Sequence, residues 1–509
     1  MFKKQYRNSY NKKNKNKNKK YKNEYKINHI KTIEKVLIII SFIFFSIINN
    51  KSFRKRNNGD TIKEFQKLLN SSFNNGDSKI NSKCLKYDPI NIFEKRLKTE
   101  PFIICQNNQS THICYKENEN LIAIKNGLVC KMENIIIDPS KSKDSGFIYN
   151  GPFDKNHSGN PILSHGFFNM KCANNKNIEN YNENYITYIN SWDYEYKDNM
   201  EGVEELAPGK IVFFMSRSQD SPNLFHGTSD LVNAISIMNI FNINPEDIQI
   251  VFLESLIIID DPMYDLYENI VSRGGKPIYI RNLKKKYHIS KAIHIPMNFD
   301  SPCFIFFGPI ICEFPTKTYK FLNFLVDKYM DIKTYEDKFI SDNITFYYPK
   351  ITIESYKSNI KFKKAITFIW RKVWPRNRPK QSRLVGNGPE LVEKLSSVIP
   401  KDYLIRLVDT SNLPISEQIS IIKSSDYVVG IHGAGFSLSI YAKYDCIIHE
   451  IWNQMYNHLL TRMSSLSGHK AYYDIITAKV DNKDHEYIYL QEDEFVNCVL
   501  KRMKENNFI

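Results

Sequence analysis

The sequence predicts an α/β protein of two domains, preceded by a basic arm and a short apolar segment. The chain has 509 residues, enough for two substantial domains. Its last third alternates β-like and helical patterns in units of the size that a parallel sheet needs. A dense run of Lys and Arg fills the first 35 residues, and an apolar run follows directly.

Residues 1–35 form the basic arm, and they carry much of the net charge of +16. Low hydrophobicity and like charge leave too little apolar surface to offset the entropy of ordering the chain, so we expect disorder here. We expect no specific nucleic-acid partner, because the positive charge lies largely in this arm. A nucleic-acid-binding module is an alternative that deletion of residues 1–35 would test.

Residues 36–48, VLIIISFIFFSII, are apolar apart from two serines. The run is shorter than the about 20 residues that usually span a bilayer. No small-residue cleavage site follows, since Asn49, Asn50 and Lys51 occupy that place. We expect an uncleaved signal anchor, with a signal-peptide core as the alternative. Lys and Arg are more numerous before it than after it, which predicts a single-pass type II protein of the endoplasmic reticulum or Golgi membrane, with a luminal catalytic part.

Nine cysteines fit that compartment, and five of them lie between residues 84 and 172. None forms a C-x-x-C pair, so the sequence gives little support for zinc. We expect a few disulfides and at least one unpaired thiol, because nine is odd. Glycosylation sequons at Asn70, Asn108, Asn156 and Asn343 are compatible with luminal exposure.

Residues 49–83 are polar and are expected to form a stem. Residues 84–350 are expected to form the first α/β domain, which is irregular up to about residue 200. Apolar alternation and periodicity predict its elements. Strands are expected at 121–124, 133–137, 147–149, 210–215, 248–253 and 277–280, and a helix at 229–241.

Residues 351–509 are expected to form the second domain, a doubly wound parallel sheet. Its strands are expected at 365–370, 403–408, 427–431, 446–451 and 471–475, and its helices at 389–398, 416–424, 434–442, 458–466 and 492–504. In such sheets the ligand lies beyond the carboxyl ends of the strands. Asp409, His432 and Glu450 fall at those ends.

The turn His432–Gly435 carries the strongest chemical signal in this domain. It reads His-Gly-Ala-Gly between an apolar strand and a helix, and Gly433 and Gly435 would let the backbone approach a ligand. Amides of the next helix's first turn could then bind a phosphate, assisted by the helix dipole. Packing of small residues is the alternative interpretation of such a turn.

Two α/β domains, of which one carries a phosphate turn, are typical of a transferase with its nucleotide donor in the second domain and its acceptor in the first. The sequence lacks G-x-x-x-x-G-K-[ST] and a G-x-G-x-x-G after a strand, which disfavours P-loop hydrolases and dinucleotide oxidoreductases. It also lacks the G-x-S-x-G elbow of α/β-hydrolases.

Three linked motifs lie in this region: ITFIWR at 366–371, RLVGNGPELV at 383–392, and SEQISIIKSSDYVVGIHGAG at 416–435. Together they resemble glycosyltransferase family 61, particularly the members that add N-acetylglucosamine to EGF domains or to O-mannose. Glu450 follows at a strand end. A weaker match, NLFHGTSD, lies upstream at 223–230.

The chain departs from the family pattern at three places, which are Trp370, the insertion 372–382 and Gly227. The resemblance implies a GT-B architecture of two facing Rossmann-like domains, an inverting transfer from a nucleotide sugar, and no obligatory metal. In such a transfer a base removes the acceptor proton while diphosphate leaves, and arginines and helix-terminal amides stabilise the leaving charge.

His226 and Asp230 are the candidates for the base. Their alternative roles are a cap of the helix for His226 and a first-turn dipole partner for Asp230. The candidate donor-binding residues are Arg371, Arg383, Asn387, His432, Gly433, Ala434, Gly435, Phe436 and Glu450.

Glu450 would accept hydrogen bonds from ribose hydroxyls, and His432 would contact the diphosphate or stabilise the turn. Salt bridges are the alternative for Arg371 and Arg383, and a loop role for Asn387. The adjacent carboxylates of Asp260 and Asp261 could bind a metal ion, although adjacent aspartates in a loop are usually solvated.

We therefore expect an inverting, metal-independent glycosyltransferase that uses a UDP-sugar as donor and needs no cofactor. N-acetylglucosamine is the favoured sugar, and Ser/Thr or glycan hydroxyls of secretory-pathway proteins are the expected acceptors. The alternatives are a family 61 pentosyl (xylosyl) transferase that acts on glycans, and a catalytically inactive luminal glycan-binding relative.

Overall fold

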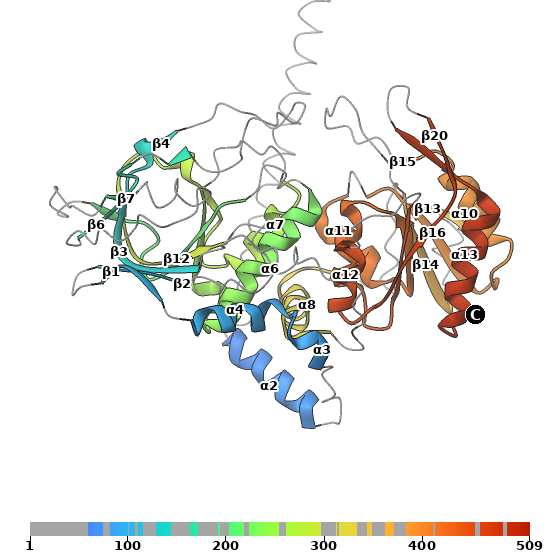
Figure 1. The fold of residues 1–509 in the computed structure, drawn as a ribbon, viewed down its shortest axis with the longest axis horizontal. Coiled ribbons are helices and arrows are strands. Elements are labelled where there is room, and N and C mark those ends of the chain that lie inside the picture. Colours follow the sequence, from blue (N-terminus) through green and yellow to red (C-terminus); the bar gives the residue numbers. More distant parts are fainter. Residues whose placement is uncertain are drawn as a thin grey trace, which may run out of the picture. The chain divides into compact units, whose positions relative to one another are not determined.

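The computed structural model is mixed α/β, with one large sheet in each of the two regions where the sequence predicts a domain (Figure 1). It describes residues 60–74, 82–99, 101–106, 110–115, 129–143, 162–163, 165–171, 192–193, 203–217, 223–253, 261–296, 312, 315–332, 344–348, 362–370, 383–410, 413–452, 459–481 and 486–509. The basic arm, the expected anchor, Arg371 and Asp260 lie outside these ranges. Within them, no helix is both long enough and apolar enough to cross a membrane.

The second domain is built on a sheet to which six described strands contribute. In spatial order they are β13 (Ile344–Tyr348), β16 (Tyr403–Val408), β14 (Lys364–Ile369), β17 (Tyr427–Ile431), β18 (Ile447–Trp452) and β19 (Lys470–Ile475). All neighbours are parallel except β13, which is antiparallel to β16. Numbered along the chain, the five parallel strands have the order 2-1-3-4-5. This doubly wound order confirms the α/β prediction and places a topological switch point between β14 and β17.

Helices cover both faces of this sheet. One face packs against α11 (Ile415–Lys423), η8 (Ala434–Tyr441) and α12 (Leu459–Leu466). The other packs against α10 (Gly388–Ser396) and α13 (Glu492–Glu505). Successive strand residues point to opposite faces, so Val428 lies in the first core and Tyr427 and Val429 lie in the second.

The helix predicted at 434–442 is a 3₁₀-helix, so its α-helical form was wrong. All residues from Phe436 to Tyr441 are buried, the two serines included, and this short segment therefore has no exposed polar face. Tertiary packing rather than helical periodicity decides its geometry, as is common for short 3₁₀ segments.

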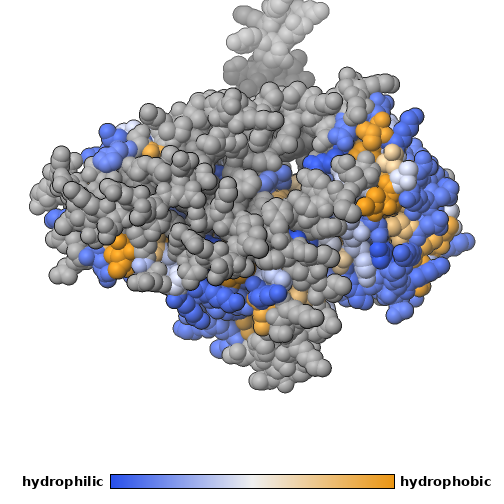
Figure 2. Space-filling view, viewed as in Figure 1, coloured by the Kyte–Doolittle hydropathy of each residue, from blue (hydrophilic) through white to orange (hydrophobic). Residues whose placement is uncertain are grey.

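A small sheet that the sequence did not predict extends the second domain. Its strands are β15 (Leu384–Val385), β21 (Tyr487–Leu490) and β20 (Ala478–Asp481), and β15 runs parallel to β21. Val480 and Tyr489 on these strands are 39% and 38% exposed. Figure 2 shows apolar surface in this part of the molecule.

The first domain contains a mixed sheet. Its central path is β1 (Phe102–Gln106), β2 (Thr111–Tyr115), β3 (Val129–Ile137), β12 (Tyr287–Ile295), β9 (Ile211–Met215), β10 (Ile248–Phe252) and β11 (Ile278–Tyr279). Strands β12, β9, β10 and β11 are parallel, while β1, β2 and β3 add an antiparallel extension. The predictions at 133–137, 210–215, 248–253 and 277–280 are confirmed, whereas 121–124 and 147–149 lie outside the described residues.

Shorter elements complete this domain. The strands are β6 (Phe168–Met170), β7 (Trp192–Asp193) and β8 (Glu204–Glu205) at the sheet, and β4 (Ser142–Lys143) paired with β5 (Ile162–Leu163). The helical segments are α3 (Ser82–Leu85), α4 (Pro89–Leu97), η1 (Pro139–Lys141), η2 (Pro245–Asp247), α7 (Tyr264–Leu266), the π-helix η3 (Tyr267–Val271), η4 (Ile280–Asn282) and α8 (Lys317–Tyr329).

Helix α6 (Leu224–Ile240) starts five residues before the predicted 229. It begins at 224 because Asn223 caps it, accepting a hydrogen bond from the Phe225 amide at 3.0 Å. The helix is buried on nearly every side, so no amphipathic stripe marks its first turn in the sequence.

Part of the expected stem is helical. Helix α2 (Thr61–Asn74) buries Ile62 and Phe65 in the core that also contains α6 and α8. The Phe65 ring lies 4.7 Å from that of Phe321 on α8, measured between centroids. These two apolar side chains give α2 enough contact to pack on the domain, although the surrounding sequence is polar.

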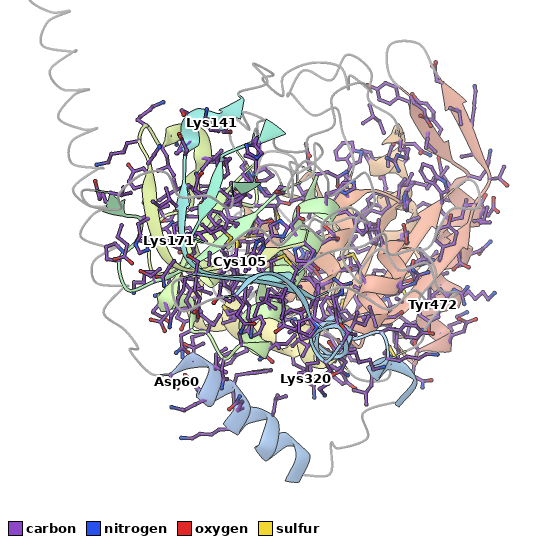
Figure 3. The ribbon with its side chains drawn as sticks, turned by 60° about the vertical axis from the view of Figure 1, so that its left-hand side comes forward. Asp60, Cys105, Lys141, Lys171, Lys320 and Tyr472 are labelled. Atoms are coloured by element: carbon purple, nitrogen blue, oxygen red, sulfur yellow. A yellow bond between two sulfur atoms is a disulfide. The ribbon has the colours of Figure 1, made fainter. Side chains whose placement is uncertain are left out.

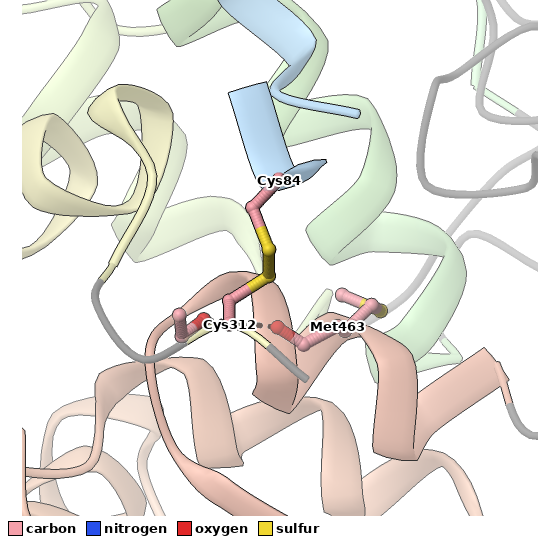
Figure 4. The surroundings of a disulfide bond; sticks show 4 residues. Cys84, Cys312 and Met463 are labelled. Carbon is pink, nitrogen blue, oxygen red and sulfur yellow. Dashed lines mark hydrogen bonds between the residues drawn. A yellow bond between two sulfur atoms is a disulfide. The ribbon is translucent and has the colours of Figure 1, made fainter. Parts of the chain in front are cut away.

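Disulfides confirm the prediction from the cysteine count. Cys84 bonds Cys312 and Cys114 bonds Cys130, and Cys105, which is labelled in Figure 3, is also disulfide-bonded. Among the described cysteines, Cys446 and Cys498 are free thiols. The Cys84–Cys312 bond lies beside Met463 of α12 (Figure 4) and belongs to the core cluster that contains residues of both domains.

We predict that removing the Cys84–Cys312 bond with a double Cys→Ala variant lowers stability by about 5 kcal/mol. The bond closes a span of 228 residues, and the loss of chain entropy in the unfolded state grows with the length of the loop. Urea unfolding under non-reducing conditions would measure the change.

The matched control is the double alanine variant of Cys114–Cys130, whose partners are only 16 residues apart. It should cost about 3 kcal/mol by the same relation. Equal unfolding midpoints for the two variants would contradict the loop-length argument.

Candidate functional site

The candidate site lies at the carboxyl edge of the second domain's sheet. Ile369 at the end of β14 pairs with Gly430 of β17, and Ile431 of β17 pairs with Ile451 of β18. Because these strands are parallel, the residues that follow them share one edge. Asp409 and His432 follow β16 and β17 directly, as predicted, and Trp452 ends β18.

The turn that follows β17 lies at the switch point between β14 and β17, the position where doubly wound sheets bind ligands. Gly433 is the N-cap residue of η8. Its φ is 171°, an extended conformation that any residue adopts, and it makes no side-chain capping hydrogen bond. The amides of Ala434 and Gly435 therefore open η8 at the ligand edge of the sheet.

The protein itself does not require a glycine at position 435. A Cβ added there would lie 3.6 Å from Ile369 Cγ2 and 3.8 Å from Thr410 Oγ1, which are ordinary contacts. At Gly430, by contrast, a Cβ would lie 2.8 Å from the Ile369 carbonyl oxygen. The fold thus demands glycine within the strand, while the turn retains space above its backbone.

His432 is held by a buried carboxylate. Its Nδ1 is hydrogen-bonded to Glu450 Oε1, and Glu450 Oε2 accepts a hydrogen bond from Thr461 Oγ1 at 2.6 Å. Glu450 is fully buried, and it lies two residues before the end of β18 rather than at its end. Both carboxylate oxygens are therefore engaged inside the protein, and this sets the orientation of the imidazole.

Arg383 and His432 both lie near the ring of Trp452, a residue that the sequence did not mark as part of the site. The Arg383 guanidinium carbon lies 5.7 Å from the Trp452 ring centroid, within cation–π range. The His432 ring lies 5.6 Å from the same tryptophan. Arg383 has a φ of 66°, a left-handed conformation that costs a non-glycine residue about 1–2 kcal/mol. Backbone strain of this kind is concentrated at functional sites.

Asn387 has a structural role in this arrangement. Its amide group donates to the Leu490 carbonyl at 2.8 Å, and its Oδ1 accepts from the Leu490 amide at 3.1 Å. It thereby joins the start of α10 to β21. Trp370 lies nearby, donating from Nε1 to the Val385 carbonyl at 3.1 Å, and Gly388 leaves room for its indole.

The two candidate bases lie one turn apart on α6. His226 is half-buried and Asp230 is 1% exposed. The N-cap is Asn223, and no acidic residue lies in the first turn, so the capping and dipole alternatives do not hold for these two residues. Helix α6 packs against η8, which brings the helix with the candidate bases against the helix that follows the turn.

Asp261 is not a solvated loop aspartate as expected. It forms an ion pair with Arg217, and its side chain is 3% exposed. The Arg217 guanidinium carbon lies 3.8 Å from the Phe252 ring centroid. Arg217 could not be singled out from the sequence, because nothing in its local pattern distinguishes it from a surface arginine.

Comparison with known proteins supplies the identity of this region. Residues 224–449 match a family model described as Glycosyltransferase 61. No curated protein matches the chain. The matched range includes His226, Asp230, Arg383 and the turn, and it ends one residue before Glu450. The chain therefore carries a domain of glycosyltransferase family 61, which is the family that its motifs resemble.

Proposed function

We propose that this protein transfers a sugar from a UDP-sugar to a hydroxyl group, with inversion and without a metal in the reaction. The family 61 domain supports glycosyltransferase activity in general. The observation that carries the finer proposal is the position of the His-Gly-Ala-Gly turn at the switch point of a doubly wound sheet, where its His432 and Arg383 both lie near the Trp452 ring.

The diphosphate of the donor would bind at this turn. Amides of Ala434 and Gly435 supply hydrogen-bond donors, and Arg383 supplies positive charge; Arg371, outside the described residues, would supply a second. His432 would contact the diphosphate through its second ring nitrogen, because Glu450 engages Nδ1. Glu450 would act as a positioning residue in place of the ribose contact expected from the sequence.

The reaction follows from this arrangement. A base on α6, either His226 or Asp230, takes the proton of the acceptor hydroxyl as its oxygen bonds to the anomeric carbon. The bond from that carbon to the diphosphate oxygen breaks at the same time. The negative charge that develops on UDP is stabilised by preorganised amides and by the arginine, which is the task that a metal performs in other enzymes.

The sugar and the compartment are further parts of the proposal. N-acetylglucosamine is the favoured donor sugar, and Ser/Thr or glycan hydroxyls of secretory proteins are the favoured acceptors. The disulfides support an oxidising compartment. This agrees with the type II membrane protein of the endoplasmic reticulum or Golgi expected from the sequence.

We predict that the full-length protein turns over one UDP-sugar in the presence of chelator and that Arg383→Ala loses this activity. Loss of a charged hydrogen bond to phosphate costs about 1.5–3 kcal/mol, or roughly 10- to 150-fold in affinity for UDP. Turnover of a panel of UDP-sugars and calorimetric UDP binding would measure both effects.

The control is Lys401→Ala, which removes an exposed positive charge just before β16, at the amino edge of the same sheet. It should leave UDP binding unchanged. Failure of the folded wild type to bind any UDP-sugar would sink the proposal, and binding without turnover would indicate the inactive relative instead.

We predict that Gly435→Ala keeps the fold but weakens UDP binding. The added methyl group has space within the protein, but it would occupy the approach of a phosphate to the backbone amides. Gly430→Ala should behave in the opposite way, destabilising the fold by about 1–3 kcal/mol through overpacking against Ile369. Thermal unfolding and UDP titration of both variants separate the two roles. Undiminished UDP affinity in Gly435→Ala would contradict phosphate binding at the turn.

We predict that replacing the true base lowers turnover by about 10²- to 10⁴-fold and leaves UDP affinity unchanged. His226→Ala and Asp230→Asn distinguish the two candidates. Asn223→Ala serves as the control, because it removes the cap of the same helix and should cost about 1 kcal/mol of stability without affecting the chemistry. If His226→Ala and Asp230→Asn both turn over substrate as fast as the control Asn223→Ala, the base lies elsewhere.

A further inference from the structure

A polar cluster lies on the side of β18 opposite to Glu450. His449 points away from the η8 face, because successive strand residues alternate. Its Nε2 lies 2.9 Å from Asp474 Oδ2 on β19 and 3.7 Å from Cys498 Sγ on α13. One ligand atom from each of the three residues falls within 4.8 Å of the others. None of these three residues takes part in the proposed binding of the donor.

We propose that His449, Asp474 and Cys498 bind a divalent ion of the zinc class. An imidazole nitrogen, a carboxylate oxygen and a thiolate sulfur are the three ligand types that zinc takes in proteins. Three protein ligands leave one tetrahedral position for water. The sequence could not indicate this site, since its residues lie about 25 positions apart and belong to no C-x-x-C pair.

The distances fit this assignment. Tetrahedral zinc, with bonds of about 2.3 Å to sulfur and 2.0–2.1 Å to nitrogen, separates those two atoms by about 3.6 Å. The observed separation of Cys498 Sγ and His449 Nε2 is 3.7 Å. The contact of His449 Nε2 with the Asp474 carboxylate, 2.9 Å, would widen by about 0.5 Å as the ion replaces the hydrogen bond.

The surroundings of the cluster resemble the outer shell of a metal site. His449 Nδ1 lies 2.7 Å from the Tyr427 hydroxyl. A metal-binding histidine usually donates its other N–H to such an oxygen, which leaves the Nε2 lone pair for the ion. Arg502 holds Asp474 in place, with Nε 2.6 Å from Oδ2.

The charges and the access path are also compatible with an ion. A thiolate and a carboxylate neutralise a divalent charge, while the guanidinium of Arg502 adds one positive charge and would moderate the affinity. Asp474 and Cys498 are half-buried rather than buried, so an ion can reach them from solvent. Arg502 also stacks on Tyr472 of β19, at 4.7 Å from its ring centroid, while it donates to both oxygens of Asp474.

A nucleophilic cysteine is the competing interpretation, and the geometry disfavours it. Asp474 and Cys498 both contact His449 Nε2. In a catalytic triad the nucleophile and the carboxylate instead contact opposite nitrogens of the imidazole ring. Binding an ion would release the thiol proton to solvent.

The other cluster of this kind among the described residues does not qualify. It consists of His112, Cys114 and Cys130. Its two sulfurs bond each other in a disulfide, so they offer no thiolate.

Metal binding by the full-length protein tests the proposal. The protein is first treated with chelator, dialysed without reductant, and titrated with Co²⁺, whose absorption reports thiolate ligation and tetrahedral geometry. We expect one equivalent of tightly bound Co²⁺, displaceable by Zn²⁺, and a higher Tm with Zn²⁺ present. Cys498→Ser should abolish the thiolate absorption and weaken binding at least tenfold.

Cys446→Ser is the matched control, because Cys446 is the second free thiol of the described chain and immediately precedes β18. It should bind Co²⁺ as the wild type does. If Cys498→Ser does not fold, Asp474→Asn removes a ligand with little change of shape and should weaken binding to a similar extent.

Wild-type protein that retains no stoichiometric metal, or a folded Cys498→Ser variant that retains it fully, would overturn the proposal. The result is independent of the transferase chemistry. UDP binding should persist in Cys498→Ser, because the donor turn lies on the other side of β18.

Discussion

The burial of η8 is the constraint on which the candidate site depends. This short helix packs against α6 of the first domain and against α11 and α12 of the second. Its Phe436, Leu438 and Ile440 belong to the core that joins residues of both domains, and Asn323 of α8 donates to the Ile440 carbonyl at 2.9 Å. Contacts with these helices hold η8 in position, so the turn before it has little freedom to move.

Strand β18 extends this constraint to two polar clusters. Glu450 on one face orients His432, and His449 on the other face meets Asp474 and Cys498. Burying the Glu450 carboxylate is costly unless its oxygens are hydrogen-bonded, and His432 and Thr461 meet that need. The pairing of β18 between β17 and β19 therefore positions both clusters, although they serve separate roles.

Regular periodicity made the second domain predictable from sequence, and the parallel strands and the turn lie where expected. The rest depended on contacts between distant segments. The sequence could not reveal Trp452 between Arg383 and His432, Thr461 beneath Glu450, or Arg217 beside Asp261, because each role arises only in the folded chain. The form of η8 and the start of α6 were missed for a different reason: both segments are buried on nearly all sides, polar residues included, and burial removes the amphipathic signal.

The motif residues of the second domain divide into two physical groups. Asn387 and Glu450 have their polar atoms bound to other parts of the protein, so they act by holding β21 and His432 in place. Arg383 is half-buried in a left-handed conformation, and Gly435 leaves space above its amide. The second group has what a ligand needs, namely charge and an accessible backbone, and the first group keeps it preorganised. A motif letter therefore does not by itself identify a ligand contact, and the hydrogen-bond partners of each side chain decide which group it joins.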